Sequence, residues 1–135
     1  MNRRAFLTSL ALAGIALPTA AAQAFTNAFT TKAFDKTAFE AAQAAGAPTL
    51  IHVFAPWCET CTAQRDVLGK LEADPAYKAL VVFNVDFDGE KPVMRGFGAQ
   101  SRSTLIAFKS KTEVGRLVGD TKAASIKALL AKAVA

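Results

Sequence analysis

The chain has 135 residues, of which 52% are hydrophobic, and it carries a formal net charge of +5 at pH 7. This length and composition fit one domain with one buried core and argue against a disordered chain. Two of the net charges come from Arg3 and Arg4, and the remaining basic residues are scattered through helical patterns without interleaved aromatic residues. That distribution is typical of a solvated surface and not of nucleic-acid binding.

The first 24 residues have the pattern of an export signal. Arg3 and Arg4 give a basic start, an uncharged apolar run follows over 6–17, and small residues at 22–24 form a cleavage site. We therefore expect residues 1–24 to be removed and residues 25–135 to act in the periplasm as a soluble, monomeric domain. The paired arginines fit a twin-arginine signal as well as an ordinary secretory one. An uncleaved signal that anchors the chain in a membrane is the alternative.

The mature part alternates between strand and helix patterns. We expect a short strand within 25–34, a helix over 36–45 between Asp35 and Gly46, a strand over 49–54, a helix over 58–73, a strand over 80–87, a short helix over 92–97, strands over 104–108 and 114–118 joined by a polar turn at 109–113, and a helix over 122–134. This order places parallel crossovers first and an antiparallel hairpin last. It predicts an α/β fold with a mixed sheet covered by helices on both faces.

The only two cysteines, Cys58 and Cys61, lie where an apolar strand meets a helical pattern. The unsatisfied N–H groups and the dipole at a helix N-terminus favour a thiolate there, so Cys58 is expected to be the nucleophile. Cys61, one turn further, would attack the mixed disulfide that Cys58 forms. A pair this close closes almost no loop and adds little as a structural crosslink. Structural zinc needs four ligands, whereas the chain offers two cysteines and one histidine.

Three segments together resemble the thioredoxin family. They read APWCETC at 55–61, GFG at 96–98 and STLIAF at 103–108, and the resemblance covers essentially all of residues 25–135. It implies a thioredoxin-like three-layer α/β/α fold with a central mixed sheet and a thiol-disulfide oxidoreductase. It also implies that the Cys58–Cys61 disulfide is the redox centre without a further cofactor, that Cys58 is exposed and Cys61 buried, and that Trp57 shields the pair. Protein thiols or disulfides would be the substrates, and a membrane-bound reductant would recharge the protein.

Glu59 and His52 are the two residues expected to tune the cysteines. A carboxylate beside Cys58 disfavours the thiolate, raises the pKa of that thiol and favours a reductant; Glu59 also fits a first-turn acid that stabilises the helix dipole. His52 stands where the family places a buried acid that accepts the proton of the inner cysteine, and an imidazole with a pKa near neutrality would serve. The alternative is a half-buried strand histidine satisfied by a hydrogen bond.

Ser103 stands where the family places a cis-proline that faces the disulfide. A cis bond before a residue other than proline costs about 2.5–4 kcal/mol, so we expect a trans Arg102–Ser103 bond and a loop over 100–104 that departs from the family's path. Trp57, Arg102, Ser103 and Thr104 form the expected substrate-docking edge. Arg102 would lower the pKa of Cys58, bind an acidic partner segment or remain a solvated loop residue.

The loss of the proline also suggests a second hypothesis of a different class. A more open cysteine pair could hold a soft ion such as Cu(I) between Cys58 and Cys61, with Ser103 or His52 nearby. The chain would then be a periplasmic metal-binding or metal-delivery protein.

Overall fold

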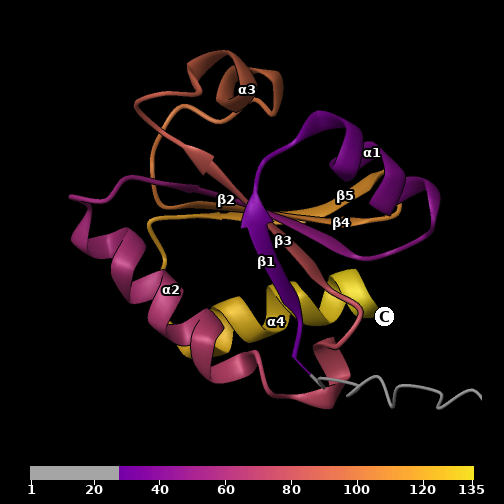
Figure 1. The fold of residues 1–135 in the computed structure, drawn as a ribbon. Coiled ribbons are helices and arrows are strands. Elements are labelled where there is room, and N and C mark those ends of the chain that lie inside the picture. Colours follow the sequence, from indigo (N-terminus) through magenta and orange to yellow (C-terminus); the bar gives the residue numbers. More distant parts are fainter. Residues whose placement is uncertain (1–27) are drawn as a thin grey trace, which may run out of the picture.

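The computed structural model describes residues 28–135, so the export signal expected at 1–24 lies outside the described residues. The described chain forms a sheet with helices packed on it (Figure 1). The elements are β1 (Thr30–Ala33), α1 (Lys36–Ala44), β2 (Thr49–Phe54), α2 (Glu59–Leu71), η1, a 3₁₀-helix (Pro75–Tyr77), β3 (Val81–Asp86), α3 (Lys91–Gly96), β4 (Thr104–Lys109), β5 (Thr112–Val118) and α4 (Ala123–Val134). This is the element order that the sequence predicts, with η1 added.

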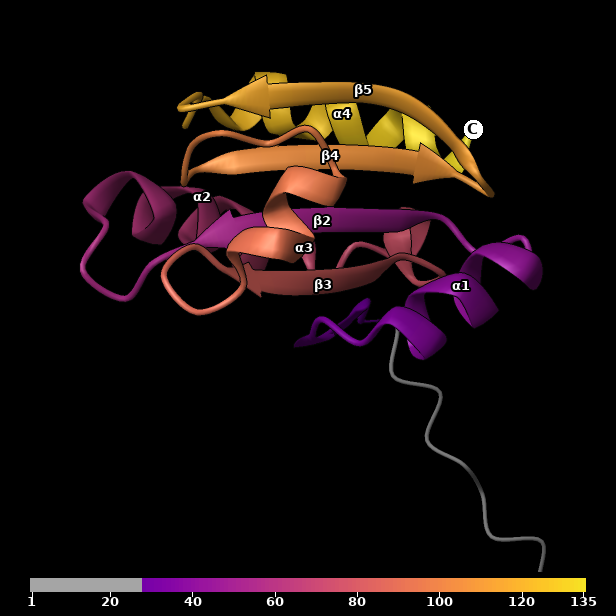
Figure 2. The ribbon, with the colours of Figure 1, turned by 90° about the horizontal axis from the view of Figure 1, so that it is seen from above.

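The sheet has five strands in the order β1-β3-β2-β4-β5. Strands β1 and β2 are parallel to β3, whereas β4 is antiparallel to both β2 and β5. Figure 2 shows β5, β4, β2 and β3 side by side, with β2 between β4 and β3. Because β2 has a partner strand on each edge and helices over each face, its residues from Thr49 to Val53 are all buried. The predicted mixed sheet is confirmed.

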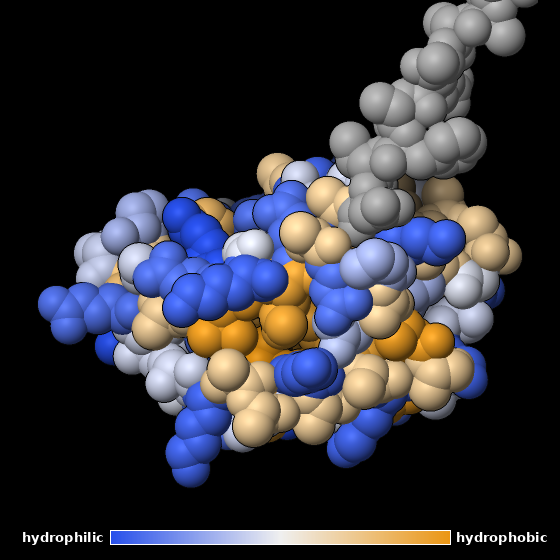
Figure 3. All heavy atoms as spheres, turned by 90° about the horizontal axis from the view of Figure 1, so that it is seen from below, coloured by the Kyte–Doolittle hydropathy of each residue, from blue (hydrophilic) through white to orange (hydrophobic). Residues whose placement is uncertain are grey.

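Alternate residues of β2 pack into two separate hydrophobic clusters, one on each face of the sheet. On one face, Ile51 and Val53 pack with residues of α1 and α3, including Phe39 and Met94. On the other, Leu50 packs with Leu68 of α2 and with residues of α4. The three-layer arrangement is therefore confirmed. Figure 3 shows the face that carries α2 and α4, where hydrophobic residues lie in the centre and hydrophilic side chains surround them.

Local signals account for most element boundaries. The Asp35 carboxylate accepts a hydrogen bond from the Ala38 N–H at 2.7 Å and caps α1, as predicted. Gly46, just past the end of that helix, has a φ of +76°, which favours glycine. Among the described residues, no helix combines the length and apolar character needed to cross a membrane.

Two local details differ from the sequence-based prediction. The five-residue turn predicted at 109–113 is wrong, because β4 extends to Lys109 and β5 begins at Thr112. Ser110 adopts a φ of +52° in the resulting tight turn, and the pairing shifts register after Ala107, as a β-bulge does. The second difference is η1, which is not predicted from the sequence: Pro75 begins a 3₁₀ turn after the end of α2.

His52 is buried in the core on the face of β2 that α2 covers. It is 1% exposed, and its Nε2 atom has no hydrogen-bond partner. Burial, which is the largest cause, and the nearby Arg65 guanidinium lower the pKa of His52 from 6.5 to about 4, against an opposite effect of the Gln64 and Asn84 side chains. The expected pKa near neutrality is therefore wrong. The alternative, a half-buried histidine satisfied by a hydrogen bond, is also wrong, because the side chain is fully buried and its Nε2 atom has no partner.

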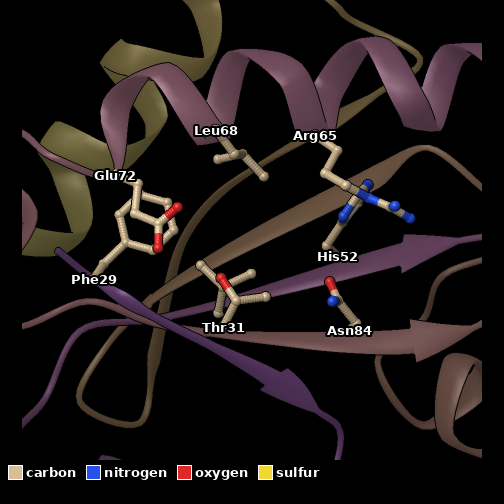
Figure 4. Close-up of a pocket in the computed structure, with 9 residues that line it drawn as sticks. Phe29, Thr31, His52, Arg65, Leu68, Glu72 and Asn84 are labelled. Carbon is tan, nitrogen blue, oxygen red and sulfur yellow. The ribbon is translucent and has the colours of Figure 1, made fainter.

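A cavity of about 230 Å³ lies beside His52, bounded by Arg65 of α2, by Glu72 just after that helix, and by Thr31 and Asn84 of the sheet. Figure 4 shows that His52 reaches up from the sheet toward α2 at the end of the cavity where Arg65 lies. The cavity thus separates part of α2 from the sheet.

The burial of His52 predicts a loss of stability in mild acid. Between pH 6.5 and 4 the unfolded chain binds a proton at this side chain and the folded chain does not, so the free energy of unfolding decreases as the pH falls through that window. We expect a loss of about 2 kcal/mol between pH 7 and pH 5, measured by urea unfolding. Since His52 is the only histidine, a His52→Leu variant should lose most of this dependence. An unchanged dependence in that variant would contradict the assignment.

Candidate active site

The cysteine pair is built into the first turn of α2. Cys58 is the N-cap residue of this helix, and its Sγ accepts a hydrogen bond from the backbone N–H of Cys61 at 3.1 Å. The two cysteines form a disulfide, with their Cα atoms 5.2 Å apart. The predicted position of Cys58 at the positive end of the helix dipole is therefore confirmed. An anionic sulfur at this point is stabilised by the unsatisfied N–H groups of the first turn.

Both cysteines are enclosed in the oxidised structure. Cys58 is 4% exposed and Cys61 is fully buried. The expectation of an exposed Cys58 is therefore wrong for this state, because Ala55, Phe54 and Phe87 pack against the pair. Cys58 is still the less buried of the two, in line with the order of attack that the sequence predicts.

Ser103 faces the disulfide directly. Its Oγ lies 3.2 Å from the Cys58 Sγ and 3.1 Å from the Cys61 Sγ, and the residue is 4% exposed. Residues 28–135 contain no cis peptide bond, so the predicted trans Arg102–Ser103 bond is confirmed. The φ of Ser103 is +58°, in the left-handed region that residues other than glycine seldom adopt. The predicted departure of the loop from the family's path, and the predicted metal access, stay predictions.

Gln64 is a site residue that the sequence analysis missed. It is completely buried, and its Nε2 donates to the backbone carbonyls of Ser103, at 2.9 Å, and Asp120, at 3.0 Å. The amide thus ties α2 to the loop that carries Ser103. Its sequence signal is weak but real, because Gln64 lies three residues after Cys61 and four before Leu68, on the buried stripe of the helix.

Among the described residues, His52 is not a hydrogen-bonding neighbour of either cysteine sulfur. The two nearest hydrogen-bonding neighbours of the Cys61 Sγ are the Val53 carbonyl, at 4.0 Å, and the Ser103 hydroxyl. Gln64 uses its amide nitrogen for the Ser103 and Asp120 carbonyls, and its Oε1 atom, like the His52 Nε2 atom, has no hydrogen-bond partner. A base with a pKa of about 4 is a poor acceptor for a thiol proton. The role of His52 in proton transfer stays a prediction, and the low pKa weakens it.

The surface beside the pair is formed by Trp57 and Arg102. Trp57 is 58% exposed, and its indole N–H donates to the Asp88 carboxylate at 2.8 Å. The Arg102 guanidinium lies 4.7 Å from the centre of the Trp57 ring, a cation–π arrangement. Arg102 therefore packs on the tryptophan. Asp88 is a further residue missed from the sequence, where it reads only as part of a turn.

The other two residues of the expected docking edge point inward. Thr104 is 2% exposed, and its hydroxyl donates to the Ser101 carbonyl at 2.7 Å. The Ser103 hydroxyl contacts the two cysteine sulfurs, as described above. A shallow depression of about 280 Å³ lies between Thr60, Arg102, Val118 and Gly119, next to Ser103. The side chains available to a partner on this edge are therefore Trp57, Arg102 and Val118.

The charged neighbours of the pair are solvated, and the residues that could hold a metal are few. Glu59 lies exposed in the first turn of α2, where it also fits the favourable end of the helix dipole.

Over the part of the chain that the structure describes, no three or more His, Cys, Asp or Glu side chains gather as metal ligands. The sulfur atoms of Cys58 and Cys61 are the two soft ligands that lie together, and here they are bonded to each other.

Comparisons with known proteins agree with this geometry. The sequence matches the Thioredoxin family over residues 27–132. It is 35% identical to a thioredoxin of Chlamydia muridarum over 83 residues, which are 62% of this chain and 79% of that protein. It is 33% identical to Thioredoxin 2 of Plasmodium falciparum over 67 residues, which are 50% of this chain but only 42% of that protein.

A solved structure shows the same likeness across the fold. The crystal structure of Trxlp from Edwardsiella tarda is 38% identical in sequence and superimposes with a TM-score of 0.72, covering 75% of this chain and 98% of that one. The match in sequence, the mixed five-stranded sheet and the cysteine pair at the start of α2 agree with one another. The chain is a thioredoxin-like redox protein and belongs to the thioredoxin family.

Proposed function

We propose that this protein is an exported thiol-disulfide oxidoreductase that exchanges its Cys58–Cys61 disulfide or dithiol with partner proteins and acts mainly as a reductant. The observation that carries the proposal is the disulfide at the N-terminus of α2, with Cys58 as the capping residue and Cys61 one turn further in. The helix end stabilises a thiolate on the outer sulfur, which is the form that attacks a disulfide.

The proposed exchange proceeds in two steps. The Cys58 thiolate attacks one sulfur of the partner's disulfide, a Cys58–partner bond forms, and the other partner sulfur leaves as a thiolate that takes a proton from solvent. Cys61, after giving up its proton, then attacks the Cys58 sulfur. The Cys58–Cys61 bond forms, the Cys58–partner bond breaks, and the partner leaves as a dithiol with the two electrons. A dithiol donor, proposed to be membrane-bound, returns the protein to its reduced form.

The direction of exchange is inferred from the charges around the pair. Glu59 directly follows Cys58 and lies in the first turn of α2. A carboxylate there disfavours the Cys58 thiolate, and a less stable reduced form makes a stronger reductant. The Arg102 guanidinium packs on Trp57, which argues against a role for this residue in stabilising the thiolate.

The docking surface is proposed to be the edge that carries Trp57, Arg102 and Val118. Trp57 and Val118 are the two large hydrophobic side chains that stand exposed among residues 28–135, at 58% and 61%. The depression beside Ser103 is lined by Val118 and Arg102. An extended segment of a partner with apolar residues next to its cysteine, and an acidic residue to meet Arg102, fits this edge.

Export is proposed from the first 24 residues, which lie outside the described structure. The basic start, the apolar run over 6–17 and the small residues at 22–24 support it. The family match begins at residue 27, which agrees with a separate leader before the domain. A periplasmic location would give the protein disulfides to act on, because they persist in that compartment.

The division of labour between the cysteines is tested by trapping. Cys61→Ser should accumulate mixed disulfides with protein partners, because the resolving thiol is gone, while Cys58→Ser should accumulate few. The measurement is non-reducing electrophoresis after acid quenching, with the double variant as the control for unspecific oxidation. Equal trapping by the two single variants would refute the assignment of Cys58 as the nucleophile.

The influence of Glu59 is tested by its isosteric amide. Glu59→Gln removes a negative charge beside Cys58 and should shift the redox equilibrium with glutathione toward the dithiol by about twofold, since exposed charges are worth little. Asp66→Asn on the same helix, two turns away, serves as the matched control and should leave the equilibrium in place. A shift toward the disulfide in Glu59→Gln would contradict the proposed charge effect.

The export route is tested with the arginine pair. In a Gram-negative host, the full chain should be found in the periplasm without residues 1–24. Changing both Arg3 and Arg4 to lysine should leave the protein inside the cell if the twin-arginine route is used, since an ordinary secretory signal needs only positive charge. Processing of the lysine variant at the normal level would instead assign the secretory route, and a full chain that stays in the cell would overturn export.

A further inference from the structure

We propose that the Ser103 hydroxyl is a catalytic group that hydrogen-bonds to the Cys58 thiolate of the reduced protein, and that Gln64 is the residue that positions it. The inference deepens the proposed thiol-disulfide exchange and rests on it. It concerns a residue that replaces the proline of the family, so the group that faces the sulfurs here has a donor that a proline lacks.

The geometry places one hydroxyl between two sulfurs. The Ser103 Oγ lies within 3.1 and 3.2 Å of the Cys61 and Cys58 Sγ atoms, and all three residues are buried. A hydroxyl has one hydrogen to donate and two lone pairs that accept. Once the disulfide is reduced, the Ser103 O–H can donate to the Cys58 thiolate while its oxygen accepts from the Cys61 S–H. Hydrogen bonds to an ionised group in a buried site are the strong ones.

The backbone holds Ser103 in place through contacts from three directions. Its N–H donates to the Val53 carbonyl of β2 at 2.8 Å, and its own carbonyl accepts from the Gly119 N–H at 2.9 Å. The same carbonyl accepts from the Gln64 amide at 2.9 Å. These bonds keep a serine at a φ of +58°, which is an unfavourable conformation for this residue type. A strained backbone that is held this firmly is a feature of functional sites.

The position of Gln64 makes it more than a packing residue. It stands on α2, the helix that carries both cysteines, and its amide reaches the carbonyl of the residue whose hydroxyl faces the two sulfurs. Any shift of the Ser103 backbone relative to the first turn of α2 would change both Oγ–Sγ distances. Gln64 therefore sets the distance between hydroxyl and sulfurs without touching the sulfurs itself.

The hydroxyl also fits the resolving step of the exchange. When Cys58 is held in a mixed disulfide it carries no charge, and the thiolate that must form next is on Cys61. The Ser103 O–H, within reach of both sulfurs, can then turn from Cys58 to Cys61 and stabilise the second thiolate. Its proton stays on the oxygen throughout, so the electron and proton balance of the two exchange steps is unchanged.

The test is the redox equilibrium of the full mature chain with glutathione near pH 8. Ser103→Ala removes the donor, destabilises the thiolate-bearing reduced form and should shift the equilibrium toward the disulfide by about tenfold, the lower end of the effect expected for one lost hydrogen bond to a charged group. Ser103→Gly removes the same donor but relieves the backbone, and should give the same shift. Ser101→Ala, an exposed serine two residues away, is the matched control and should not change it.

Gln64→Met tests the positioning role and should shift the equilibrium in the same direction by a smaller factor. Circular dichroism and urea unfolding of each variant establish that it is folded. Wild-type equilibria in both Ser103→Ala and Ser103→Gly would overturn the proposal, and a shift in Ser103→Gly opposite to that in Ser103→Ala would assign the effect to backbone strain instead. If Cys61→Ser trapped no partner, the exchange function would fail, whereas the glutathione equilibria would still report on the Ser103 hydroxyl.

Discussion

The central strand β2 fixes every part of the candidate site. It pairs with β3 on one edge and β4 on the other, and it leads directly into the turn before α2. Near its end, the Val53 carbonyl accepts from the Ser103 N–H and the Phe54 carbonyl accepts from the Phe87 N–H. One buried strand, made rigid by packing, thus positions the cysteines, the Ser103 loop and the segment that carries Asp88.

The sequence predicts the parts of this site that depend on local signals. A capping aspartate, an apolar strand and two cysteines at a helix start are each read within a few residues, and the structure confirms them. Gln64, Asp88 and the backbone of Ser103 depend on contacts between residues more than 30 positions apart. Nothing in the local sequence says which carbonyl a buried glutamine will meet, because that is decided by how the helices pack on the sheet.

His52 shows that polar groups in this core are held at a cost in stability. Its Nε2 atom and the Gln64 Oε1 atom are both buried without a hydrogen-bond partner, and an unsatisfied buried polar group commonly costs about 1–3 kcal/mol. The hydrophobic cluster on this face of the sheet, which includes Leu50 and Leu68, offsets this cost. Two buried polar side chains, His52 on β2 and Gln64 on α2, therefore stand where apolar side chains would give a more stable core.

The serine at position 103 changes how such a site can work. A proline there would fix the backbone by its ring and present only carbon to the sulfurs. Here the backbone is trans and left-handed, and hydrogen bonds to the Val53 carbonyl and from the Gly119 and Gln64 N–H groups replace the rigidity of the ring. The charged groups nearby, Glu59 and Arg102, are exposed and strongly screened. The dipole of the α2 N-terminus and the buried Ser103 hydroxyl are screened less, so they act on the Cys58 thiolate in the direction opposite to Glu59.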